Sequence, residues 1–306
     1  MTTTSDYSLT WDLLADLQLL LRFHFMQNAF VVGTLVAILA GAVGYFVVLR
    51  GQSFVAHMLS QVGFPGAAAA VLLHFPPVIG LAAFCTAGAL AVGVVGRRLD
   101  AGNRMESAVV ASVLAFSLGL GLLFFRLYAG SAQAVYAFLF GTILGITDRD
   151  VAVTVVTTVV CLVALAAIAR PLVFASVDPD VAEARGVPVR AISIAFLLVA
   201  ALAVAVTVQI VGTLLIFALL VAPGACALQL TASPARGLAL TVVLSLLFTW
   251  TGLAVAYFTI YPVGFFITSL AFATYVAIRG AKAISRTPTG QAHAGRTSDS
   301  FGGEPA

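Results

Sequence analysis

Two long stretches in the second half of the chain contain no charged residue. One runs from Ala191 to Ala235 and the other from Gly237 to Ile278, with Arg236 between them. An α-helix needs about 20 predominantly apolar residues to cross a lipid bilayer, so each stretch is long enough for two crossings. Only 9% of the 306 residues are charged, whereas soluble domains carry about 25%. The chain is therefore predicted to lie in a membrane.

The apolar runs predict an all-α fold, a polytopic bundle of transmembrane helices. A β-barrel would show segments of about 10 residues with strict alternation, and these runs are longer and unbroken. The predicted spans share a length near 20 residues and few charges; they are 28–49, 54–73, 78–96, 107–127, 151–170, 191–208, 211–230, 237–258 and 263–279. Because several spans follow one another closely, we expect eight or nine crossings.

The segments around the spans differ in composition. Residues 1–27 mix apolar and acidic residues and predict an amphipathic surface segment, whereas residues 281–306 are rich in small polar residues and predict a disordered cytoplasmic tail. The membrane domain is placed between them, at 28–280. The apolar segment 132–146 is too short to cross comfortably and predicts a re-entrant or half helix.

Basic residues predict the orientation of the chain. Most arginines follow the first, third, fifth, seventh and ninth spans, and few lie in the loops of the other side. Positively charged loops stay in the cytoplasm. We therefore expect a multi-pass protein of the plasma membrane, with its N-terminus outside and its C-terminus inside.

Several functions are disfavoured by the residues. The single lysine, Lys282, lies outside any G-x-x-x-x-G-K-[ST] motif, so this chain is not expected to bind ATP. No H-E-x-x-H motif and no pair of intramembrane carboxylates indicates an enzyme or an ion-coupled carrier. The net charge of +3 does not indicate nucleic-acid binding. If the protein transports anything actively, the energy is expected to come from another subunit.

One polar loop in the middle of the chain, "RPLVFASVDPDVAEARGVPVRA", predicts a short helix on the cytoplasmic side. Asp178 can cap this helix, Pro179 suits its first position, and Asp180 and Glu183 fall in its first turn. Gly186 is placed to end it. A short charged helix between two spans suits docking onto a cytoplasmic partner, although the same pattern fits an ordinary capped linker.

Four blocks of the sequence, in order, carry a resemblance to a known family. They are "FMQNAFVVGTLVAILAGAVGYFVVLRGQSFVAHMLSQVGFPGAA", "YAFLFGTILGIT", "SVDPDVAEARGVPVRA" and "VQIVGTLLIFALLVAPGACALQLTAS". The third is similar to F-D-P-x-x-A-x-x-x-G-x-P and the fourth to V-G-x-L-L-x-x-A-L-L-x-x-P-A-A-x-A. Both patterns are those of permease subunits in the zinc/manganese (ABC-3) family of metal ABC transporters. The resemblance covers about residues 25–280.

The resemblance implies partners as well as a fold. It implies a homodimer of permeases around one central path, a separate cytoplasmic ATP-binding ABC subunit, and an extracellular metal-binding lipoprotein. Residues 178–190 would be the coupling helix that contacts the ATPase, with the named positions Asp178, Pro179, Asp180, Glu183, Arg185 and Gly186. No stably bound cofactor is implied, only a transported zinc or manganese ion.

A metal path is suggested by a histidine inside an apolar span. His57 and Gln61 lie four residues apart and would share one helix face. The family shows D-A-L-S-H-x-x-x-P-G here, and alignment on Ser60 and Gly66 puts His57 at the Asp position and Gln61 at the His position. An imidazole suits zinc and also binds manganese. Two protomers would supply a ring of four ligands, unless His57 instead bonds to a neighbouring helix carbonyl.

Other residues have open roles. His74 is a second, weaker metal candidate at the external end, or an interfacial histidine. Pro223 and Gly224 interrupt a span and either line the path or allow close helix packing. Arg50 is expected to anchor the chain at the cytoplasmic surface or to contact the ATPase.

These features together predict the function. We expect the membrane-spanning permease subunit of an ATP-driven importer of a divalent transition metal, with zinc ahead of manganese, and no enzymatic activity of its own. The alternatives are an ABC permease for a metal chelate or a cobalamin-like cargo, and a nucleotide-independent metal channel or carrier.

Overall fold

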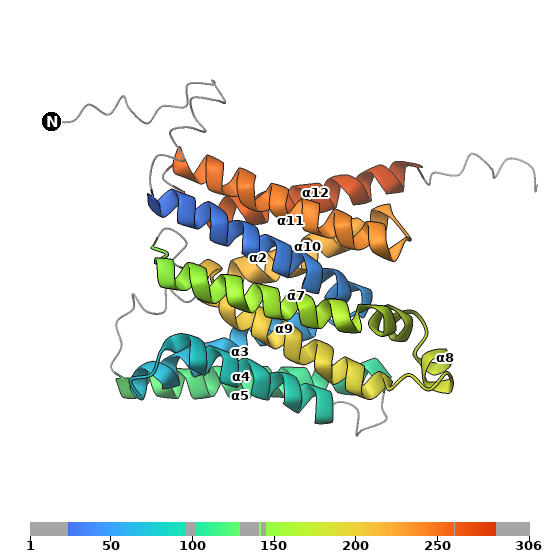
Figure 1. Ribbon diagram of the computed structural model, residues 1–306, viewed down its shortest axis with the longest axis horizontal. Helices are drawn as coiled ribbons and strands as arrows, with labels where there is room; N and C mark the ends of the chain where they lie inside the picture. The colour runs from blue at the N-terminus through green and yellow to red at the C-terminus, as the bar shows by residue number, and fades with distance from the viewer. Residues whose placement is uncertain (1–23, 96–101, 129–140, 142–144, 260, 286–306) are drawn as a thin grey trace, which may run out of the picture.

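The computed structural model describes residues 24–95, 102–128, 141, 145–259 and 261–285 (Figure 1). Within these ranges the regular structure is helical. The helices, in chain order, are α2 (His24–Leu49), α3 (Ser53–Leu72), α4 (Pro77–Val95), α5 (Gly102–Tyr128), α7 (Asp148–Val177), α8 (Pro179–Ala184), α9 (Val189–Val211), α10 (Thr213–Leu230), α11 (Pro234–Tyr257) and α12 (Val263–Ser285). The greater part of the predicted half helix at 132–146 and of the two predicted terminal segments lies outside the described residues.

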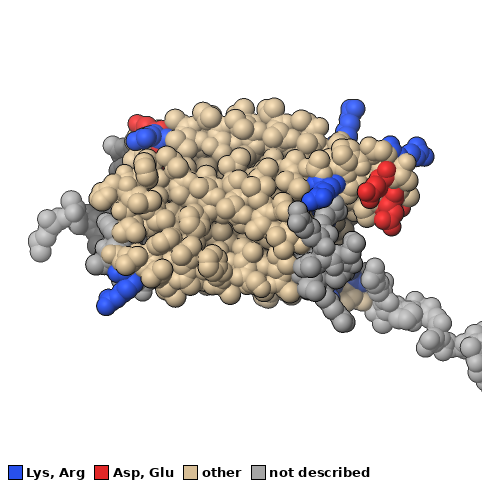
Figure 2. Space-filling model, turned by 90° about the horizontal axis from the view of Figure 1, so that it is seen from below, with Lys and Arg blue, Asp and Glu red and all other residues tan. Residues whose placement is uncertain are grey.

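Nine of the described helices are long and apolar enough to cross a membrane, which confirms the upper count from the sequence. Figure 1 shows them running alongside one another as a bundle, with α8 at one end. Figure 2 shows the charged side chains near the two ends of the molecule, with a wide uncharged belt between them. Such a belt suits the hydrocarbon core of a bilayer, which is about 30 Å thick.

Two helices extend beyond the predicted spans into polar sequence. The first span was predicted to begin at residue 28, but α2 begins at His24. The fifth was predicted as 151–170, but α7 runs from Asp148 to Val177. At 1.5 Å per residue, its 30 residues extend about 45 Å, beyond the apolar layer. Hydropathy marks only the part of a helix that lies in lipid, so it misses turns that continue into water.

The core of the bundle lies along α2 and α9, each of which has 72% of its most apolar window buried in the protein. Their buried faces are rich in small residues, which let helices approach closely in a membrane. One very close crossing joins α2 to α10, where a Cβ atom on Gly44 would overlap the carbonyl oxygen of Leu220. By contrast, α12 and the described spanning part of α5 are only 17% buried in this chain. These two helices therefore leave most of their surface for lipid or for another chain.

Candidate metal path and coupling helix

His57 lies one turn into α3, where its ring faces α10. The imidazole packs edge-on against the ring of Phe217, with ring centroids 5.0 Å apart and an interplanar angle of 68°. Its Nδ1 atom is buried and has no hydrogen-bond partner among the described residues. A buried polar atom without a partner carries a free-energy cost, so such atoms are uncommon in native proteins unless they serve a function. The hydrogen bond to a neighbouring carbonyl that would have explained His57 structurally is therefore not seen at Nδ1.

Gln61 follows His57 by one helical turn and is half-buried. The two side chains leave the same face of α3 because residues four apart overlie one another in an α-helix. Ser60 lies between them and is fully buried; its hydroxyl donates to the His57 carbonyl at 2.7 Å. That bond satisfies Ser60 within its own helix. The pair available for a ligand on this face is therefore one imidazole and one amide.

His74 is far from this pair. It follows α3 directly, is exposed, and has a left-handed backbone with φ of 59°. The seventeen residues from His57 to His74 correspond to about 25 Å of helix, so the two histidines cannot bind one ion within a single chain. The His74 amide donates to the Val71 carbonyl and the Phe75 amide to the Ala70 carbonyl, which is the pattern that ends a helix. This position has an evident structural role.

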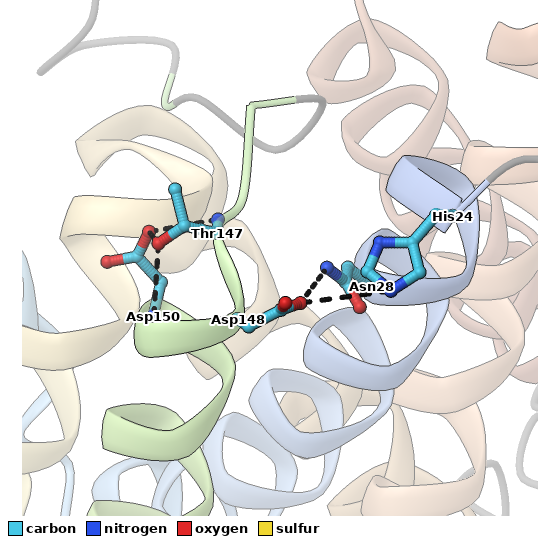
Figure 3. A network of polar contacts seen from close by, with 5 residues as sticks. All are labelled: His24, Asn28, Thr147, Asp148 and Asp150. Atoms are coloured by element: carbon cyan, nitrogen blue, oxygen red, sulfur yellow. Dashed lines mark hydrogen bonds and ion pairs between the residues drawn. The ribbon is translucent and has the colours of Figure 1, made fainter.

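A polar network joins the starts of α2 and α7 (Figure 3), at the end of the bundle opposite α8 (Figure 1). Asn28 Nδ2 donates to Asp148 Oδ1 at 3.0 Å, and His24 Nε2 lies 3.9 Å from the same oxygen. The Asp150 carboxylate instead accepts from the backbone amide and hydroxyl of Thr147, forming a capping box. Asp148 and Asp150 therefore serve different partners. Among the described residues, no three His, Cys, Asp or Glu side chains are grouped to hold a metal ion.

The predicted short helix on the polar loop is present as α8. Asp178 caps it by accepting from the Val181 amide at 3.0 Å, and Pro179 occupies the first turn. Gly186 ends it with φ of +79°, a conformation that residues with a Cβ adopt at a cost. The Val187 amide returns to the Ala182 carbonyl at 3.0 Å. The start and end of this helix were thus predicted from residue types alone.

One side of α8 is anchored and the other is free in this chain. Ala182 is fully buried against Ala175 of α7 and Val189 of α9. The side chains of Asp180, Val181, Glu183 and Arg185 are exposed. Figure 1 shows α8 at the outer end of α7 and α9. A short helix that is seated on the bundle and presents charges together with one apolar residue has the form of a docking element.

Pro223 and Gly224 are buried within α10, which is one continuous helix. A Cβ atom on Gly224 would lie 3.0 Å from the Gly44 carbonyl oxygen and 3.0 Å from Val48 Cγ2. These two glycines therefore set the close crossing of α2 and α10. Of the two roles considered for Pro223 and Gly224, this geometry supports helix packing, while a role in lining the path stays a prediction.

The contacts made by Phe217 and Arg50 could not be predicted from the sequence. Phe217 meets His57 from another helix, across 160 positions of the chain. Arg50 hydrogen-bonds to side chains 126 and 143 positions away. Hydropathy and helix periodicity describe one segment at a time and cannot indicate such pairs.

Comparison with known proteins is consistent with this architecture. The family model described as the ABC 3 transport family matches residues 22–280. A manganese transport system membrane protein, MntC, from Listeria monocytogenes is 31% identical over 212 residues, which cover 69% of this chain and 74% of the relative.

Several solved protein chains share the fold. PsaBC from Streptococcus pneumoniae, solved in complex with a Fab, has a chain that matches with a TM-score of 0.76 and 27% identity, covering 87% of this chain and 94% of that one. An inward-facing metal-chelate type ABC transporter matches with a TM-score of 0.66, covering 91% and 92%. Its 17% identity supports the fold alone. Since the family model spans nearly every described helix, this chain belongs to the ABC 3 transport family, as a multi-pass permease.

Proposed function

We propose that this permease forms the membrane path of an ATP-driven importer of a divalent transition metal ion. It would act as a homodimer in the plasma membrane, with its N-terminus outside and its C-terminus in the cytoplasm. A separate ABC subunit would bind and hydrolyse ATP, and an extracellular metal-binding lipoprotein would deliver the ion. The permease itself would have no enzymatic activity and no resident cofactor.

The observation that carries this proposal is the environment of His57. An ionisable residue within a membrane helix is expensive and most often marks a pathway for ions or substrate. The Nδ1 atom of His57 has no hydrogen-bond partner among the described residues. Phe217 packs against the imidazole ring but has no polar atom in its side chain that could bond to Nδ1. A neutral imidazole with a free nitrogen is a ligand for transition metals. His57 is thus suited to contact an ion in transit.

The donor set also bears on which metal is carried. Imidazole suits zinc, which placed zinc first in the sequence analysis, whereas the amide oxygen of Gln61 is a harder ligand of the kind that suits manganese. The Listeria relative is named for manganese transport. We therefore propose manganese as the principal cargo and zinc as its competitor. Neutral ligands bind a divalent ion more weakly than carboxylates would, and weak binding permits release.

Within the part of the chain that the structure describes, His57 and Gln61 give two donors on this face of α3, which is fewer than either metal requires. A second copy facing the first would contribute another His57 and another Gln61. The homodimer would thereby complete a ring of four ligands on its axis. In the proposed cycle, the two copies of α3 separate toward one side of the membrane and then toward the other.

The free energy of ATP hydrolysis in the ATPase subunit would be transmitted to the permease through α8. Its exposed acidic residues Asp180 and Glu183 and its apolar Val181 would rest in a groove of the ATPase. Because Ala182 seats α8 against α7 and α9, movement of the docked helix would move both spans. The rearrangement of the path would follow from that movement.

The test is metal uptake into vesicles that contain the permease, with and without its ATPase and ATP. We expect accumulation of ⁵⁴Mn²⁺ only when both are present, inhibition by excess Zn²⁺, and loss of accumulation with His57→Ala. Uptake by the permease alone would contradict the proposal and favour a channel or carrier. Uptake of a metal chelate or a cobalamin, with no uptake of the free ion, would favour the other alternative.

A further inference from the structure

Arg50 occupies a rigid turn between the first two described spans. The Gln52 amide donates to the Val47 carbonyl at 2.9 Å, and the Gly51 amide donates to the Val48 carbonyl at 3.0 Å. With Gly51 at φ of +67°, these two bonds form a Schellman motif, which ends α2 tightly. The next helix, α3, begins at once and carries His57. The position of Arg50 is therefore fixed relative to the start of α3.

The guanidinium group of Arg50 reaches two other helices. Its Nη2 donates to Ser193 Oγ of α9 at 2.7 Å, and its Nη1 donates to Ser176 Oγ of α7 at 3.4 Å. Its Nε donates to Gln52 Oε1 at 3.3 Å, and its Cζ lies 5.8 Å from the ring centroid of Phe196 on α9. A planar group with five donors suits such divergent bonding.

Both serines are oriented to accept these bonds. The Ser193 hydroxyl donates to the Val189 carbonyl at 2.8 Å, and the Ser176 hydroxyl donates to the Leu172 carbonyl. Each hydroxyl thus uses its proton within its own helix and offers a lone pair to Arg50. The result is a continuous set of hydrogen bonds from the end of α7, through Arg50, to the start of α9.

The two serines lie on either side of α8 in the chain. Ser176 precedes Asp178, the residue that caps α8, by two positions. Ser193 lies one turn after Val189, which packs against the underside of α8. Arg50 therefore hydrogen-bonds to the end of α7 and to the start of α9, the two helix ends on which α8 rests. Arg50 itself belongs to the turn that leads into α3.

We propose that Arg50 is a positioning residue that transmits the movement of α8 to α3 and so to His57. This role deepens the proposed function and presupposes it. An anchor at the membrane surface, the role first expected for Arg50, would leave the guanidinium among lipid headgroups and water. The three hydrogen bonds and the Phe196 contact tie it instead to the helices that support the coupling element.

The test measures metal ions taken up per ATP hydrolysed by the assembled transporter in vesicles. Arg50→Gln removes the charge and the branched donor set. We expect it to lower this ratio at least about fivefold, the lower range for coupling between distant sites, while ATP hydrolysis continues. Arg50→Lys should fall between wild type and Arg50→Gln, because an ammonium group cannot span both serines in a fixed fork.

A second variant and a control separate this role from general stability. Ser176→Ala with Ser193→Ala removes only two hydroxyl groups, and we expect it to lower the same ratio. Arg236→Gln removes an exposed arginine at the same end of the bundle and should leave the ratio unchanged. Manganese bound to the permease should keep its histidine coordination in Arg50→Gln, since Arg50 acts on movement and not on the ligand.

The outcomes also distinguish this role from the proposed function. If the wild-type assembly accumulates manganese but the Arg50 and serine variants keep its uptake-to-ATP ratio, Arg50 does not transmit movement. If protein yield or thermal stability falls while the ratio holds, its role is structural only. If the wild-type assembly accumulates no metal with ATP, the proposed function fails, and the role of Arg50 fails with it.

Discussion

The close crossing of α2 and α10 gives a prediction whose size follows from the coordinates. In Gly44→Ala, the new Cβ would overlap the Leu220 carbonyl oxygen and lie 2.8 Å from the carbonyl carbon and 3.0 Å from its Cα. Ordinary contacts of a Cβ atom begin near 3.4 Å. All three atoms belong to the backbone, so no rotamer change can relieve the overlap. The two helices would have to separate.

The expected loss of stability is the difference between two effects. Overpacking in a filled interior costs about 1–3 kcal/mol, and a backbone-to-backbone overlap belongs at the upper end. The higher helix propensity of alanine offsets about 1 kcal/mol. The net destabilisation is therefore about 2 kcal/mol, which corresponds to a fall in melting temperature of about 3 °C for a chain of 306 residues.

The assay is thermal unfolding of the purified permease in detergent, followed by tryptophan fluorescence. Gly119→Ala is the matched control, because Gly119 lies within α5 and a Cβ there would meet nothing within 4 Å. It should leave the melting temperature unchanged or raise it slightly. Equal melting temperatures for Gly44→Ala and wild type would refute the proposed crossing of α2 and α10.

Three further predictions concern function. Gln61→Ala should lower manganese uptake, because the amide oxygen is the harder donor of the pair and suits manganese; undiminished uptake in a dose–response of ⁵⁴Mn²⁺ would exclude Gln61 as a ligand. Reversing the charges of Asp180 and Glu183 to lysine should lower co-purification of the ATPase, since like-charge contacts replace attraction across an interface; Arg236→Gln serves as the control, and undiminished co-purification would exclude α8 as the docking element. His74→Gly should preserve uptake and raise thermal stability by up to about 1 kcal/mol, because glycine adopts the left-handed conformation without strain; a loss of uptake would restore His74 as an entry ligand.

The sequence predicted those features that depend on local physics. Nine spans followed from hydropathy, and the cap at Asp178 and the stop at Gly186 followed from residue types with special backbone roles. The length of α7 did not, because helix formation continues past the apolar segment when a cap such as Thr147 satisfies the first amides. Local residue patterns therefore predicted which helices form, but they did not predict every helix boundary.

The candidate site was predicted only in part. The spacing of His57 and Gln61 placed them on one face, since that depends on one helix alone. Their surroundings depend on packing between helices: Phe217 reaches His57 from α10, and Arg50 finds Ser176 and Ser193 on α7 and α9. Such contacts join segments over a hundred positions apart, and nothing in the local residue pattern specifies them.

The central claim is that His57 touches the transported ion, and pulsed electron paramagnetic resonance of bound Mn²⁺ tests it most directly. The full transporter is loaded with Mn²⁺ and the coupling of the metal to nearby ¹⁴N nuclei is recorded. The account predicts an imidazole nitrogen signal that is present in wild type, retained in His74→Gly and absent in His57→Ala. An unchanged imidazole signal in His57→Ala, or a wild-type ion surrounded only by oxygen, would contradict it.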